Sequence, residues 1–270
     1  MHPQPKSQTD NQKWAACIEY DGSQFSGWQR QCGQASVQAA LEYALGEVAA
    51  CPTTVVAAGR TDTGVHACGQ VVHFQSGSRR SNWGWMRGAN SNLPAAVAVV
   101  WVKPVAAEFH ARFSATQRRY RYVLLNRRVR PTYLRERVTW DYRELDVEAM
   151  RVAAEPLLGR HDFSAFRAGA CQAKSPIRTL RRLHIDRSGN WVWLDVAADG
   201  FLHHMVRNLV GSLLAVGAGE RSPDWIAEVL EGTDRCRAGI TAPAHGLYLT
   251  GVEYPAHFAL PPAPAACRFW

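Results

Sequence analysis

Apolar positions recur along this chain in two rhythms, one typical of strands and one typical of helices. Large or apolar residues occupy alternate positions from Trp14 to Tyr20 (Trp14, Ala16, Ile18 and Tyr20), which predicts a half-buried strand. After Ser36, a residue suited to cap a helix, apolar residues return every three or four positions until Pro52. The first half is therefore expected to contain strands at 14–20, 53–58, 69–74 and 95–102, and helices at 37–48 and 81–90.

The second half repeats this β-α-β-β-α-β order. Its expected strands lie at 115–126, 180–186, 191–197 and 247–254, and its expected helices at 147–158, 201–216 and 223–230. Two β-α-β-β-α-β units predict two ferredoxin-like halves in an α+β protein. Joined at an edge, they would form one mostly antiparallel sheet with a central cleft. We expect the halves at 13–110 and 111–255, with flexible tails at 1–12 and 256–270.

The charge is concentrated in the second half. The 270 residues carry a net charge of +8, and ten arginines between Ala111 and Arg143 face only Glu136 and Asp141. Aromatic residues are interleaved with these arginines. Such a mixture suits an RNA backbone and its unstacked bases, although a solvated basic face would give the same composition. Along 119–122 arginine and tyrosine alternate, so only one of the two sets can face a shared site.

The seven cysteines are scattered, with no C-x-x-C pair. This spacing argues against a zinc site or a disulfide framework and favours a reducing compartment. The first residues lack the apolar core of a signal peptide, and no apolar run approaches a membrane span. We therefore expect a cytoplasmic protein without a membrane partner.

The turn between two of the expected strands carries unusual chemistry. Where a short Gly, Asn or Asp turn would suffice, the chain places an arginine, a carboxylate, two threonines and a histidine, in the sequence Gly59-Arg60-Thr61-Asp62-Thr63-Gly64-Val65-His66-Ala67. Asp62 would be presented on a stiff loop with a cation two residues away. The same residues also fit an ordinary Asx-type turn with a surface ion pair.

The expected helix over 201–216 holds a second unusual residue. Arg207 lies in the middle of an apolar helix, where a buried charge needs a partner unless the side chain extends to solvent. His203 and His204 are adjacent on this helix. Metal ligands on one helix face are spaced by three or four residues, and no matching Cys, His or carboxylate set is visible, so no metal site is expected.

Four stretches together closely resemble the tRNA pseudouridine synthase A family. They are the turn 59–67; Phe109-His110-Ala111-Arg112-Phe113-Ser114-Ala115 running into Arg119-Tyr120-Arg121-Tyr122; Phe201-Leu202-His203-His204-Met205-Val206-Arg207-Asn208; and Gly246-Leu247-Tyr248-Leu249. They occur in the order found in the family and cover the chain from about Trp14 to Tyr254. Both tails fall outside the resemblance.

The resemblance implies a cofactor-free, homodimeric isomerase that converts uridine to pseudouridine at positions 38 to 40 of the tRNA anticodon arm. Asp62 would be the catalytic carboxylate, acting at C1′ or on the 2′ proton, with Arg207 as its partner. Arg60 would fill the gap left by the flipped base. Tyr120 would stack on or hydrogen-bond the uracil, and Leu247 would close the apolar side of the pocket.

Other functions would leave different signatures. A non-catalytic RNA-binding protein explains the arginines but not a fixed carboxylate with an internal Arg partner. A glycoside hydrolase needs two carboxylates, and no second acid lies in a comparable loop. A base-excision enzyme would release free uracil. A pseudouridine synthase acting on another RNA stays an alternative.

Overall fold

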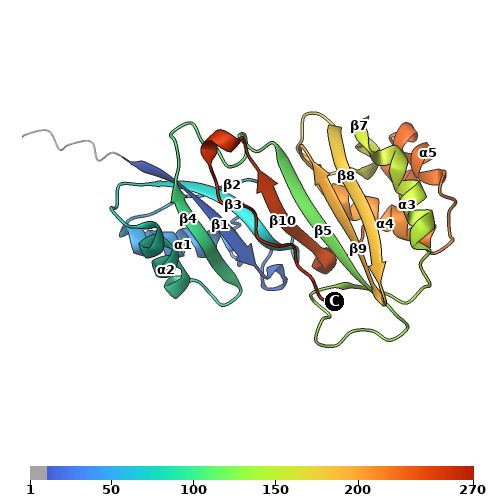
Figure 1. Cartoon of the computed structure of the whole chain (residues 1–270), viewed down its shortest axis with the longest axis horizontal. Helices are drawn as coiled ribbons and strands as arrows, with labels where there is room; N and C mark the ends of the chain where they lie inside the picture. The colour runs from blue at the N-terminus through green and yellow to red at the C-terminus, as the bar shows by residue number, and fades with distance from the viewer. Residues whose placement is uncertain (1–10) are drawn as a thin grey trace, which may run out of the picture.

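The computed structural model describes residues 11–270. Its centre is one ten-stranded sheet that runs across the whole molecule (Figure 1). The strands are β1 (Gln12–Tyr20), β2 (Val56–Ala57), β3 (His66–Ser76), β4 (Val97–Pro104), β5 (Gln117–Asn126), β6 (Thr139–Asp141), β7 (Gly159–Asp162), β8 (Ile177–Ser188), β9 (Trp191–Ala198) and β10 (Leu247–Glu253). The helices are α1 (Val37–Ala49), α2 (Asn82–Asn92), α3 (Val147–Ala154), α4 (Met205–Gly217) and α5 (Trp225–Gly232).

The strand order confirms the predicted pair of ferredoxin-like halves. It runs β4-β1-β3-β10-β5-β9-β8-β7, with β2 also paired to β3 and β6 to β5. The first half therefore reads β4-β1-β3-β2 and the second β10-β5-β9-β8, the same order twice. Within each of these two sets of four strands, every pair is antiparallel. The α+β sheet is mostly antiparallel, as the sequence predicted.

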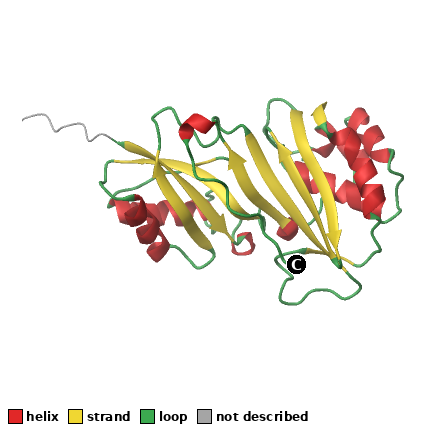
Figure 2. Cartoon of the chain, viewed as in Figure 1, coloured by secondary structure: helices red, strands yellow, loops and turns green. Residues whose placement is uncertain are grey.

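The two halves meet between β3 and β10. This pair is parallel, with Tyr248 opposite His66 and Leu249 opposite Ala67. Both strands begin at this contact, so the turn that precedes β3 and the segment that precedes β10 arrive at the same point. Figure 2 shows the α-helices gathered at the two ends of the sheet. By the labels of Figure 1, α1 and α2 lie at one end and α3 to α5 at the other.

Alternation along β5 divides the core between the two faces of the sheet. Tyr120, Tyr122 and Leu124 belong to the large apolar cluster that also contains the buried side chains of α4. Val123 and Leu125 belong to a smaller cluster on the other face, against which the C-terminal residues pack. Even-numbered and odd-numbered residues of β5 therefore pack into different cores, because successive side chains of a strand point to opposite faces of the sheet.

The C-terminal stretch differs from the sequence expectation. A flexible tail was predicted for 256–270, whereas Trp270 stacks on Trp193, with ring centroids 4.1 Å apart, and Phe269 stacks on Trp191. The two terminal aromatic rings pack on the half-buried indoles of β9, and the burial of such large rings stabilises this contact. Of the predicted N-terminal tail, residues 1–10 lie outside the described part. Among residues 11–270, no helix is both long and apolar enough to cross a membrane.

The predicted helix over 201–216 begins later than expected. Helix α4 starts at Met205, and His204 precedes it with φ of 61°, a left-handed conformation that ends any continuous helix there. Residues 201–204 are therefore a connection between β9 and α4. This correction changes where His203 and His204 point.

Candidate active site

The turn that carries Asp62 is fixed by hydrogen bonds on both sides. The Val65 N–H donates to the Asp62 carbonyl at 3.1 Å, which closes the turn on itself. The Trp28 N–H donates to the carbonyl of Thr61 at 3.0 Å, and the Tyr20 and Thr61 hydroxyls are 2.8 Å apart. Gly64 has φ of 79°, a conformation that suits glycine. The Asp62 carboxylate is thus presented on a backbone with little freedom.

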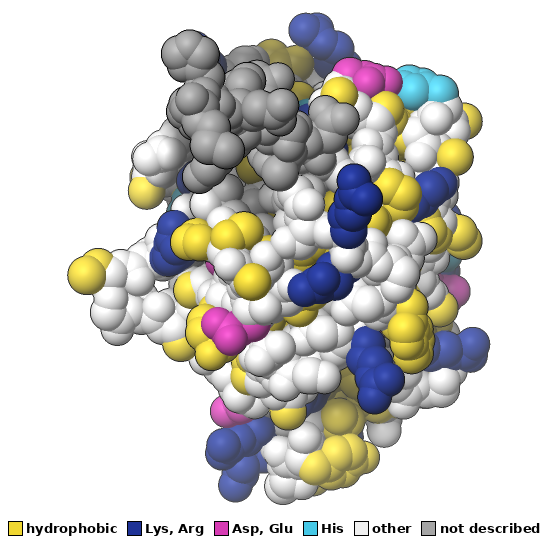
Figure 3. Space-filling model, turned by 90° about the vertical axis from the view of Figure 1, so that its left-hand side faces the viewer, with side chains coloured by type: hydrophobic (Ala, Val, Ile, Leu, Met, Phe, Trp, Pro, Cys, Tyr) yellow, Lys and Arg dark blue, Asp and Glu magenta, His cyan; other side chains and the backbone are white. Residues whose placement is uncertain are grey.

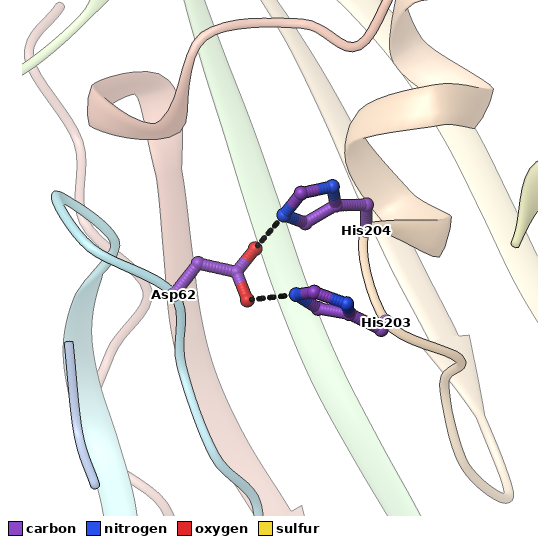
Figure 4. A group of neighbouring side chains, drawn as sticks. All are labelled: Asp62, His203 and His204. Carbon is purple, nitrogen blue, oxygen red and sulfur yellow. Dashed lines mark ion pairs between the residues drawn. The ribbon is translucent and has the colours of Figure 1, made fainter. Parts of the chain in front are cut away.

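Three cationic or potentially cationic side chains surround this carboxylate. Arg207 Nη1 donates to Asp62 Oδ2 at 3.1 Å. His203 Nε2 lies 3.4 Å from Oδ1 and His204 Nε2 lies 3.4 Å from Oδ2 (Figure 4). The Asp62 side chain keeps 25% of its surface exposed, and that of Arg207 keeps 16%. Asp62 comes from the first half and its three partners from the second, so the group exists only because the halves join.

Arg207 is itself held in place by the backbone. Its Nε donates to the Ala242 carbonyl at 2.8 Å, and the Ala242 N–H donates back to the Arg207 carbonyl at 3.1 Å. One edge of the guanidinium is therefore anchored while another faces Asp62. The alternative in which this side chain extends to solvent is wrong, because the guanidinium donates to Ala242 and Asp62 and the side chain keeps only 16% of its surface exposed.

His203 and His204 correct the sequence argument about metals. That argument assumed helical spacing, but both residues precede α4, and their Nε2 atoms lie with a carboxylate oxygen of Asp62 within 4.8 Å of one another. Imidazole nitrogen and carboxylate oxygen are donors that Zn²⁺ accepts, so these three residues could hold a cation. The Arg207 guanidinium beside the same carboxylate opposes one. Burial lowers the pKa of His204, against the pull of Asp62, which favours the neutral ring.

Tyr120 and Leu247 lie at the same seam. Tyr120 is buried, and its ring meets Phe201 edge-on with centroids 5.1 Å apart. Burial raises the pKa of the Tyr120 phenol, and the negative charge of Asp62 raises it further, so the hydroxyl keeps its proton at neutral pH. Leu247, also buried, begins β10 opposite Tyr122. Arg60 is exposed, two residues before Asp62.

The comparisons with known proteins agree with this arrangement. A family model described as tRNA pseudouridine synthase matches residues 16–114 and 153–255. The chain belongs to the tRNA pseudouridine synthase family. It is 57% identical to a tRNA pseudouridine synthase A of Thiobacillus denitrificans over 92% of this chain and 95% of that protein. It is 52% identical to the Nitrosococcus oceani protein of the same name, over 94% of this chain and 98% of that protein. It is 55% identical to the Pectobacterium atrosepticum protein of the same name, over 92% of this chain and 88% of that protein.

One residue that the sequence reasoning missed lies on β5, between the two matched stretches. Arg118, beside Tyr120 on β5, donates to the carbonyls of Ala58, Arg112, Ala115 and Asp199. These carbonyls belong to the stem of the Asp62 turn, to the connection before β5 and to the connection that leads to His203. One guanidinium thus ties together three segments around the site. In the sequence, Arg118 looks like any other member of an arginine run.

The arginines of the basic segment fall into two groups. Arg121 is engaged with Asp195 at 2.7 Å, on the face of the sheet that the C-terminal residues cover, and Arg143 pairs with Asp141 and Glu220. Of the alternating set on β5, the tyrosines therefore face Asp62. Arg127, Arg128 and Arg130 are exposed on the connection between β5 and β6. Basic side chains at the opposite end of the molecule are spread singly over the surface (Figure 3).

Proposed function

We propose that this protein isomerises uridine to pseudouridine at positions 38 to 40 of the tRNA anticodon arm. The observation that carries the proposal is the ion pair of Asp62 with Arg207, formed across the seam of the two halves in a member of the tRNA pseudouridine synthase family. A non-catalytic RNA-binding protein would have no reason to keep a carboxylate partly exposed beside an arginine and two histidines. The curated relatives are named tRNA pseudouridine synthase A.

The chemistry assigns one role to each residue of the site. The N1–C1′ bond of uridine breaks and a C5–C1′ bond forms; C5 loses a proton and N1 ends with one, so atoms and electrons balance without a co-reactant. Asp62 acts on the ribose, at C1′ or on the 2′ proton. Arg207 holds that carboxylate through the hydrogen bond from Nη1 and balances its charge. Because no co-reactant is required, we propose that the enzyme uses no cofactor and no metal.

The remaining residues hold the base. The target uridine lies in a helical stem and has to be flipped out to reach Asp62. We propose that the exposed side chain of Arg60 enters the space that the flipped uridine leaves in the stem. Tyr120 would contact the uracil with its ring or hydroxyl, and Leu247 would close the apolar side of the pocket. The half at 13–110 would supply the carboxylate, and the half at 111–255 its partners and the basic segment. On the family resemblance we also propose a cytoplasmic homodimer.

The direct test is incubation of the protein with an unmodified tRNA transcript, followed by carbodiimide treatment and primer extension to map pseudouridine. We expect stops at uridines 38 to 40. Asp62→Asn should abolish them while tRNA affinity stays within about threefold, because phosphate contacts reside elsewhere. Product at other uridines would redirect the proposal to another RNA site, and normal turnover by Asp62→Asn would refute the role of Asp62.

A further inference from the structure

A second turn near the site presents an aromatic ring instead of a charge. Phe113 lies in the connection between β4 and β5, and 75% of its surface is exposed. Several large apolar side chains are exposed among the described residues, and what distinguishes Phe113 is the rigid turn that carries it and the cation beside it. The residues around it, 109–115, form part of the family resemblance, yet the ring lies outside the group around Asp62.

The turn beneath this ring is built from internal hydrogen bonds. His110 Nδ1 accepts from the N–H groups of Arg112 and Phe113, each at 3.2 Å. The Ser114 N–H donates to the His110 carbonyl at 2.9 Å, and the His110 N–H donates to Ser114 Oγ at 3.0 Å. Buried residues fix the turn from below: the Ala111 N–H donates to His73 Nδ1 at 3.1 Å. The backbone is thus satisfied without any ligand, and the exposed ring is preorganised.

The Phe113 ring contacts His110 on one face, and most of the remaining ring surface is exposed to solvent. The His110 imidazole stacks on it, with centroids 4.4 Å apart and planes at 29°. The guanidinium carbon of Arg112 lies 5.4 Å from the ring centroid. Among the described residues, no carboxylate pairs with Arg112 within 4.0 Å. The surface therefore offers a held aromatic ring beside a cation without an acidic partner.

This surface adjoins the Asp62 turn. A single nitrogen, Arg118 Nη2, donates to the carbonyl of Ala58 and to that of Arg112. Because both hydrogen bonds start from one nitrogen, the carbonyl oxygens of Ala58 and Arg112 lie within about 6 Å of each other. Ala58 is four residues before Asp62, on the same stem. An RNA whose uridine reaches Asp62 would therefore pass close to Phe113.

We propose that the ring of Phe113 is a stacking platform for an unpaired base of the tRNA anticodon arm, and that Arg112 contacts the adjoining phosphate. The inference rests on the proposed function and specifies how that site holds its RNA. A nucleotide fits both parts of the surface, because its base offers a flat face to an aromatic ring and its phosphate accepts from arginine. A protein partner would need an apolar patch, whereas Phe113 is flanked by exposed Arg112 and half-buried His110.

The test is a binding titration of Phe113→Ala and Phe113→Tyr with an unmodified tRNA transcript. Loss of one base–aromatic stack corresponds to about 5- to 150-fold weaker affinity. We expect Phe113→Ala to fall in this range and Phe113→Tyr, which keeps the ring, to stay within about twofold of the wild type. Arg112→Ala should lower the slope of log affinity against log salt by about 1, and Phe113→Ala should leave the slope unchanged.

Trp83→Ala is the matched control. Trp83 is a comparably exposed aromatic residue, 63% exposed, on α2 at the end of the molecule away from β5. Its replacement should leave tRNA affinity unchanged. Wild-type tRNA affinity in Phe113→Ala would overturn the stacking proposal. The proposal would also fail if sedimentation showed that Phe113→Ala loses self-association while its tRNA affinity is unchanged. If that variant binds and modifies tRNA normally, only the platform fails; if the wild type neither binds nor modifies tRNA, the proposed function fails with it.

Discussion

The two turns that we propose contact the RNA differ in how they are supported. The turn 59–67 presents a carboxylate, whose partners Arg207, His203 and His204 all come from the other half of the chain. The turn 109–114 presents a ring, and His110 within the same turn supplies both its stacking partner and its backbone acceptor. The carboxylate is held by side chains that are distant in the sequence, whereas the ring is held by its own turn. Catalysis therefore depends on the joining of the halves far more than stacking does.

The largest effect is expected from removing the main partner of the first turn. Arg207→Leu should lower kcat/KM at neutral pH on the order of 10²- to 10³-fold, as loss of a preorganised charged donor does. Without the guanidinium the carboxylate loses the donor that holds and neutralises it. Steady-state kinetics of the two proteins at pH 7.5 measures this.

Two further variants separate charge from geometry. Arg207→Lys keeps the charge but loses the fixed fork, so an intermediate loss is expected. In thermal melts, Asp62→Asn combined with Arg207→Leu should be more stable than Arg207→Leu alone, because the stranded carboxylate is gone. Simple additivity of the two destabilisations would show that the residues are not coupled.

A smaller effect is expected from the residue that joins the two turns. Arg118→Met keeps an unbranched apolar stem but removes the donors to Ala58, Arg112, Ala115 and Asp199. Both turns should then shift, lowering kcat/KM on the order of 10- to 100-fold, because small displacements of reacting groups are costly. Arg119→Met is the control, since Arg119 is 43% exposed and pairs with Glu253. Equal effects of the two substitutions would remove the special role of Arg118.

The fold was readable from the sequence because its signal is local. The strand-forming runs of β1 and β5 and the i, i+3/i+4 rhythm of α1, capped by Ser36, each arise within one element. The expectation of a half-buried β1 was wrong, because Trp14 to Ile18 are buried without interruption. The repeated order then fixes the arrangement of strands. The other errors fall where local rules end: His204 adopts a left-handed φ inside an apolar pattern, and the C-terminal rings pack on β9, a contact between segments about 75 residues apart in the chain.

The candidate site was only partly readable. Asp62 and Arg207 stand out because each is a charge in a stretch where none is needed for folding, and the structure brings them together. His203 and His204 were placed on the wrong element, so their approach to Asp62 was missed. Arg118 gave no signal, because its role depends on four carbonyls from three segments, and backbone acceptors look alike in a sequence.

The smallest effect concerns the base of the second turn. Burial, aided by the positive charges that His110 and Lys13 can carry, lowers the pKa of His73 to about 4. An unfolded histidine titrates near 6.5, so the unfolded chain binds the proton first as pH falls, and stability present above pH 6.5 is lost between about 6.5 and 4. Protonated His73 Nδ1 also cannot accept from the Ala111 N–H, which anchors the turn of Phe113.

His73→Asn tests this step, because an amide oxygen can replace the acceptor without titrating in this range. Between pH 7.5 and 5.5 the wild type should lose about 1 kcal/mol more unfolding free energy in urea than the variant does. Comparing the two proteins cancels the contributions of His110 and the other histidines. Activity at pH 7.5 should be nearly equal in both, since the carboxylate and its partners are untouched. Equal acid sensitivity would mean that the second turn does not depend on His73, leaving His110 as its main support.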